Sequence, residues 1–123
     1  WQKGNVDAQW TKVLYSVYAH VICKLREAEA SMGQMFIAFR QANDAGVDPA
    51  VIKQAQDLHS VAHTNWEWWT ASNGSWFHNM PQAKESLAKS VAASQKATKL
   101  LRDAVAAKVA AQAQPQAQQT AQK

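Results

Sequence analysis

His78 is the side chain in this sequence that is best placed to do chemistry, because it stands in a short turn between two long helical patterns. Trp76 and Phe77 precede it, and Pro81 follows as a helix-start signal. An imidazole nitrogen is a good ligand for iron, and aromatic walls would keep water away from a large flat group such as a haem. Residue chemistry alone also allows a packed histidine that is hydrogen-bonded to backbone, so both interpretations stay open at this point.

A second group of possible metal ligands stands on the expected second helix. His59 and His63 are four residues apart and Glu67 follows after four more, so the three side chains share one helix face. Two imidazoles one turn apart can reach a common zinc ion, but a structural zinc site needs a full set of four ligands. The residues therefore predict either a face turned to solvent or to a partner, or a zinc or iron site completed across a symmetric interface.

Cysteine usage limits the covalent chemistry of the chain. Cys23 is the only cysteine, which excludes an internal disulfide and a multi-cysteine zinc site built by this chain alone. His20 precedes it by three residues, but attachment of a c-type haem needs two thiols followed by a histidine. We therefore expect His20 to lie at a helix interface.

The elements that must position these side chains are three helices, expected at about residues 5–43, 49–72 and 81–111, so the fold class is all-α. In the first of them, apolar residues recur at steps of three and four, as they do on one face of a helix. Such a helix would be about 55 to 60 Å long, so we expect it to pack along another long element or another chain. The apolar stripe consists of Val6, Trp10, Val13, Val17, Val21, Leu25, Ala28, Met32, Met35 and Phe39.

The link between the first two helices carries a complete stop-and-start signal. Gly46 suits the left-handed position that ends many helices, and Asp48 and Pro49 suit the N-cap and first turn of the next helix. Because the link is short, the two helices should form an antiparallel hairpin. The residues of the second helix expected to face inward are Val51, Ile52, Ala55, Leu58, Ala62, Trp66 and Trp69.

The third helix has a heptad-like seam that suits packing along another helix. Beyond about residue 111 the chain is rich in glutamine and alanine and contains Pro115. We therefore expect a single helical domain over 1–111 and a flexible tail over 112–123. The seam consists of Leu87, Val91, Ser94, Thr98, Leu101, Val105 and Val109.

Charge is uneven along the chain. Residues 1–80 hold 6 Lys/Arg against 7 Asp/Glu, a net charge of −1, whereas residues 81–123 hold 7 against 2, a net charge of +5. The basic residues alternate with alanine and serine and not with the aromatic side chains of nucleic-acid-binding surfaces, so we expect a solvated face and no nucleic-acid partner. The most apolar stretch is about half the length that a membrane span needs. No signal peptide is recognisable, which suits a processed product or a piece of a larger polypeptide.

The residues around His78 form a series with a recognisable order. A tryptophan-rich helix, residues 62–69, leads through Ala71-Ser72-Asn73 to Phe77-His78-Asn79 and Pro81. This series resembles the C-terminal signature of the ammonia-forming cytochrome c nitrite reductases. The resemblance covers about residues 10–105 and includes Tyr18-Ala19-His20, Arg26-Glu27-Ala28-Glu29, the Ala45-Gly46-Val47 link and Leu58-His59. A divergent multihaem relative, such as an octahaem reductase, would show similar features.

The resemblance implies a periplasmic multihaem enzyme that reduces nitrite to ammonium, usually as a homodimer joined along long helices. His78 matches the distal axial ligand of an electron-transfer haem in that family. The CxxCH motifs and catalytic residues of the family lie upstream of the matching region, so the haem c would be covalently attached to a partner chain and ligated in trans. The side chains expected to shield it are Trp76, Phe77, Trp66 and Trp69. The alternative from a different class is a cofactor-free helical scaffold that oligomerises.

Overall fold

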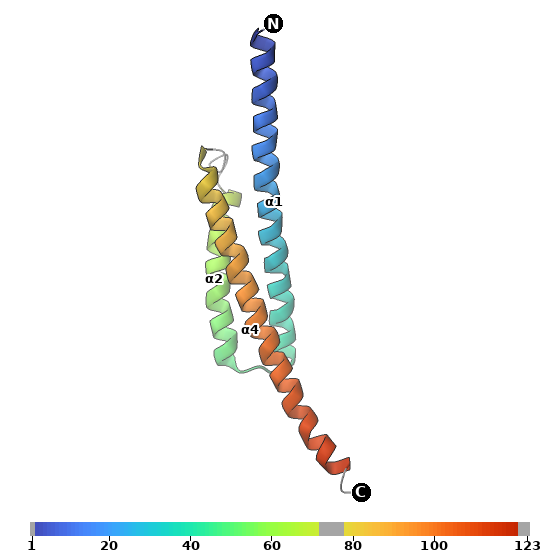
Figure 1. Ribbon diagram of the computed structural model, residues 1–123. Helices are drawn as coiled ribbons and strands as arrows, with labels where there is room; N and C mark the ends of the chain where they lie inside the picture. The colour runs from blue at the N-terminus through green and yellow to red at the C-terminus, as the bar shows by residue number, and fades with distance from the viewer. Residues whose placement is uncertain (1, 72–77, 121–123) are drawn as a thin grey trace.

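The computed structural model describes residues 2–71 and 78–120, which form three long helices (Figure 1). α1 covers Gln2–Asp44, α2 covers Pro49–Ala71 and α4 covers Met80–Thr120. No strand occurs in the two described ranges, so the all-α prediction is confirmed. Over the same ranges, no helix is both long enough and apolar enough to cross a membrane.

The turn between α1 and α2 ends the first helix in the manner of a Schellman motif. The N–H of Val47 donates to the carbonyl of Ala42 at 3.0 Å. Gly46 has a φ of 63°, a left-handed conformation that costs a residue with a Cβ about 1–2 kcal/mol. α2 then starts at an Asp48 N-cap, whose Oδ1 accepts the N–H of Ala50 at 2.8 Å. The sequence-predicted link is therefore confirmed.

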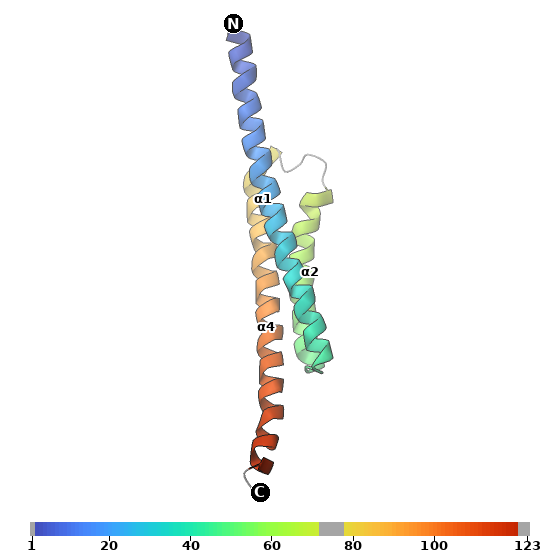
Figure 2. The ribbon, with the colours of Figure 1, turned by 90° about the vertical axis from the view of Figure 1, so that its right-hand side faces the viewer.

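α4 holds the hairpin of α1 and α2 together. The first two helices run antiparallel from their link (Figure 1), and the view turned by 90° shows α4 running beside them (Figure 2). α4 packs extensively against both α1 and α2, whereas α1 and α2 contact each other much less. The buried core therefore lies mainly along the two faces of α4.

The core is built largely from alanine and serine, at positions that repeat about every seven residues. This repeat is typical of helices that pack along one another at a small crossing angle. Short side chains in the seam let the helix backbones approach closely. The buried positions that follow this repeat are Val21, Ala28, Met35 and Ala42 on α1, Ala55, Ala62 and Trp69 on α2, and Ala83, Leu87, Ser90, Ser94, Ala97 and Leu101 on α4.

The predicted seam of the third helix is largely buried from Leu87 to Leu101 but is exposed near its end. Val109 is 57% exposed, because α4 continues past the bundle at the end where α1 and α2 are linked (Figure 1). The helix extends to Thr120, beyond the boundary expected near residue 111. The flexibility expected for 112–123 stays a prediction.

The apolar stripe predicted for the first helix is buried only from Val21 onward. Before that residue, Val6, Trp10 and Val13 of the stripe are 49–63% exposed. The reason is length: α2 has 23 residues, and α2 ends and α4 begins near the middle of α1 (Figures 1 and 2). The first half of α1, residues 2–20, therefore projects beyond the bundle as a single helix, which we call the α1 arm.

Candidate functional site

His78 lies at the end of the bundle where α2 finishes and α4 begins. Its side chain is exposed, and it stands two residues before the first residue of α4. The intervening Asn79 is hydrogen-bonded to the first turn of α4, where its Nδ2 donates to Gln82 Oε1 at 2.5 Å. The two aromatic residues predicted beside His78, Trp76 and Phe77, lie outside the described residues. His78 is thus attached to the start of a long, well-packed helix.

The tryptophans of α2 divide between core and surface. Trp69 is 4% exposed and packs in a cluster with Ala28 of α1 and Ala83 of α4, and Trp66 is half-buried beside it. Trp68, which the sequence analysis did not single out, is 66% exposed. Successive residues of a helix point about 100° apart, so two adjacent tryptophans cannot share the core face. The same geometry predicted that Trp66 and Trp69 face inward, and it leaves Trp68 on the exposed side of α2.

Trp68 lines an open groove between α2 and α4 with a volume of about 400 Å³. A hydrogen bond connects its two walls, in which the Ser86 hydroxyl on α4 donates to Asn65 Oδ1 on α2 at 3.0 Å. We call this the Trp68 groove. Its lining consists of Thr64, Asn65, Trp68 and Trp69 from α2 and Gln82, Glu85, Ser86 and Lys89 from α4.

The α4 wall of the Trp68 groove carries one ion pair. Lys89 Nζ lies 2.7 Å from Glu85 Oε1, and both side chains are exposed. The hydrogen bond from Lys89, together with its positive charge, lowers the pKa of the Glu85 carboxyl below its ordinary value. The groove therefore presents an aromatic ring on one wall and a paired carboxylate and ammonium on the other.

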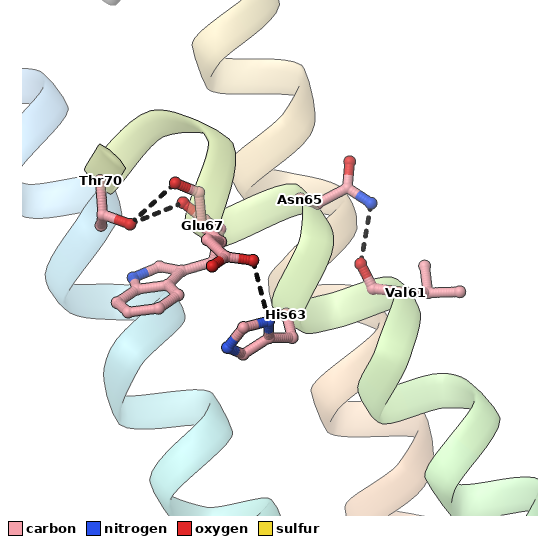
Figure 3. A network of polar contacts seen from close by, with 6 residues as sticks. Val61, His63, Asn65, Glu67 and Thr70 are labelled. Atoms are coloured by element: carbon pink, nitrogen blue, oxygen red, sulfur yellow. Dashed lines mark hydrogen bonds and ion pairs between the residues drawn. The ribbon is translucent and has the colours of Figure 1, made fainter. Parts of the chain in front are cut away.

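His59 and His63 belong to a row of rings that joins α1 to α2. The ring centroids are 5.3 Å apart for Phe36 and His59, and 5.7 Å apart for His59 and His63. The row ends at Trp66, whose ring centroid lies 5.7 Å from that of His63. Nδ1 of His63 also lies 3.4 Å from Glu67 Oε2 (Figure 3). These contacts place His59 in a packing contact between α1 and α2, whereas the ring neighbours of His63 lie on α2 itself.

The possible ligands do not converge on one point within this chain. Over the residues that the structure describes, no three His, Cys, Asp or Glu side chains form a group that could hold a metal ion. His59 Nε2 is buried without a hydrogen-bond partner, and His63 turns its Nδ1 toward Glu67. His20 and Cys23 are exposed. Within residues 2–71 and 78–120, no helix interface covers His20, because the packed part of α1 begins at Val21.

Comparisons with known proteins relate the whole arrangement to one family. A family model described as cytochrome c552 matches residues 6–123, which is nearly the whole chain. The matched range includes all of α2 and α4, most of α1, and His78. No curated protein matches the chain.

Proposed function

Because the chain belongs to the cytochrome c552 family, the family of the ammonia-forming cytochrome c nitrite reductases, we propose that it is a helical part of a multihaem c-type cytochrome of that type. Its role is to supply His78 as the distal axial ligand of an electron-transfer haem. The sequence given has Cys23 alone, whereas a c-type haem is attached through two cysteines, so residues outside this sequence would hold the haem. In this proposal they belong to a partner chain, and nitrite reduction would take place there.

The donor set of this chain fits an axial position on haem iron. His78 would be the single donor that this chain supplies to the iron of a haem held outside this sequence. His78 offers one exposed imidazole at the start of α4, and this observation carries the proposal. A group of three converging ligands is not required for such a role.

Each part of the bundle end has a task in this proposal. When bound, the haem supplies one-electron transfer. His78 donates the lone pair of a neutral ring nitrogen, and α4 fixes the backbone from which that ring projects. Trp69 and Trp66 hold the end of α2 against α1 and α4. As the resemblance implies, Trp76 and Phe77 would shield the haem from water. We place the assembled protein in the periplasm, as the resemblance implies.

The α1 arm supplies the contact between protomers in the same proposal. Its exposed apolar side chains, including Trp10 and Val13, would leave water if two arms packed along each other. Size-exclusion chromatography with light scattering should show a dimer for the wild-type chain and a monomer for Trp10→Glu. Val61→Glu is the control, because Val61 is 49% exposed on α2. A dimer that survives Trp10→Glu would remove the arm from the interface.

The ligand role of His78 is tested by a spectrum of the native complex. His78→Ala should leave the helix content unchanged and convert one low-spin bis-histidine haem to a five-coordinate or water-ligated form. His20→Ala is the control, because His20 is also exposed but lies at the base of the α1 arm. An unchanged absorption spectrum in His78→Ala would rule out ligation by this residue.

The second possible function is a cofactor-free helical scaffold, and the exposed apolar α1 arm is the observation that favours it. In that case the arm serves association alone and His78 has no metal partner. A colourless, monodisperse oligomer isolated from the native source would support the scaffold. A native particle with a Soret band of low-spin haem would support the cytochrome.

A further inference from the structure

The exposed Trp68 side chain and His78 belong to the same end of the bundle because of how α2 and α4 are aligned. The Ser86 hydroxyl contacts Asn65, and Trp69 packs against Ala83, so residues 65–69 of α2 lie beside the first turns of α4. Trp68 belongs to that stretch, in the last turn of α2. His78 stands at the same end of the bundle, five residues before Ala83 in the sequence. The Trp68 groove therefore lies at the same end of the bundle as the proposed iron ligand, and its lining begins on α4 at Gln82, four residues after His78.

The walls of the groove suit a flat ring system that carries negative groups at its edge. The indole of Trp68 is 66% exposed and offers an aromatic face for stacking. Lys89 lies on the opposite wall, and its ammonium group has three N–H donors. One of these reaches Glu85, which leaves donors for a second carboxylate. A haem has these two properties, since its porphyrin is flat and apolar and its propionates are carboxylates.

We propose that the Trp68 groove receives the edge of the haem that His78 ligates, with Trp68 packing on the porphyrin and Lys89 binding a propionate. This inference rests on the proposed function and adds two residues that position the haem without bonding to its iron. Glu85 opposes the same propionate, so Lys89 and Glu85 should act in opposite directions on affinity.

The test is a titration of the full chain with a haem c peptide that carries one histidine ligand of its own and one open axial position. Ligation is read from the shift of its absorption spectrum to the low-spin form. We expect Trp68→Ala to weaken binding about three- to tenfold, as loss of an aromatic contact does. Trp10→Ala, with 63% exposure on the α1 arm, is the matched control and should leave binding unchanged.

The charged pair is tested in the same titration. Lys89→Gln should weaken binding about two- to fivefold and reduce its dependence on salt, as expected for an exposed charge pair. Glu85→Gln should instead strengthen binding about twofold. A purely structural ion pair would make both substitutions act in the same direction, which would overturn the role of Lys89. Lys84→Gln is the control, because Lys84 lines a different groove, between α1 and α4.

The outcomes separate this inference from the function on which it rests. If the wild-type chain gives no low-spin spectrum, or if His78→Ala gives the same one, the proposed function fails and the groove assignment fails with it. If ligation depends on His78 but is indifferent to Trp68→Ala and Lys89→Gln, only the groove assignment is overturned. A Trp68→Ala chain that binds the peptide normally but loses the haem-bearing partner would assign the groove to polypeptide, which also overturns it.

Discussion

The Ser86 hydroxyl on α4 lies 3.0 Å from both the main-chain carbonyl and the side-chain Oδ1 of Asn65 on α2. Asn65 in turn donates from its Nδ2 to the carbonyl of Val61 at 2.8 Å (Figure 3). This contact joins α2 to α4 through two residues that lie 21 positions apart in the sequence. It sets the alignment of the bundle end that carries Trp68 and His78.

Removing the Ser86 hydroxyl should destabilise the protein. Ser86→Ala loses a net interhelical hydrogen bond, which is worth about 0.5–1.5 kcal/mol. Ser94→Ala is the matched control, because the Ser94 hydroxyl is buried without a hydrogen-bond partner. Its replacement should be neutral or stabilising. Chemical denaturation of both variants measures the difference, and equal losses would mean that the Asn65 contact adds nothing.

Truncating Trp69 should cost far more than truncating Trp10. Trp69 fills the space between α1 and α4, and removal of such a buried ring costs about 3–5 kcal/mol. Trp10 is 63% exposed on the α1 arm, so Trp10→Ala should change the unfolding free energy of the monomer by less than about 0.5 kcal/mol. Urea unfolding at a concentration where the chain is monomeric makes the comparison. A large loss for Trp10→Ala would show that the arm packs within the chain.

Two glycines should respond in opposite directions to alanine. Gly46→Ala places a Cβ on a residue with φ of 63° and should destabilise the hairpin by about 1–2 kcal/mol. Gly33 lies within α1, where an added Cβ meets nothing within 4 Å. Gly33→Ala should therefore stabilise the helix by about 0.5–1 kcal/mol. Melting temperatures of the two variants give the signs, and a Gly46→Ala chain of undiminished stability would contradict the left-handed conformation.

The Glu85 carboxyl should titrate below its ordinary range because of Lys89. A pKa that folding lowers adds stability above the unfolded pKa, and this contribution is lost as pH falls through the folded pKa. Carbon-13 NMR of the carboxyl should therefore give a midpoint below 4.5 in the wild type, and a higher one in Lys89→Gln. The stability difference between wild type and Glu85→Gln should shrink as the solution is acidified below that pH. Identical midpoints in the two chains would show that the ion pair is not formed in solution.

Local signals in the sequence were sufficient for the elements of the fold. Gly46, Asp48 and Pro49 gave the link between α1 and α2 because a left-handed residue and an N-cap depend on neighbouring backbone alone. The spacing of apolar residues likewise predicted which face of α4 is buried between Leu87 and Leu101. The length over which α1 packs could not be predicted in this way. The same apolar spacing continues from Val6 to Phe39, whereas only the part from Val21 onward has a partner helix.

The site was predictable in chemistry but only partly in geometry. His78 could be singled out by residue type and by resemblance. The helical spacing also predicted that Trp66 and Trp69 face inward, and Trp69 is buried in the core. Shielding of a haem by these two residues stays a prediction. Trp68 lies one residue before Trp69 and is exposed because the helix turns by about 100° per residue.

The alanine and serine seam also determines how stability should vary with temperature. Burial of short side chains removes little apolar surface from water per residue. In the α1 arm, most of the large apolar side chains stay exposed, so folding buries little of their surface. The heat-capacity change on unfolding should therefore fall below the usual value of about 12–15 cal/mol/K per residue. A small heat-capacity change flattens the stability curve, so an isolated chain would lose stability only gradually on cooling or warming from its optimum.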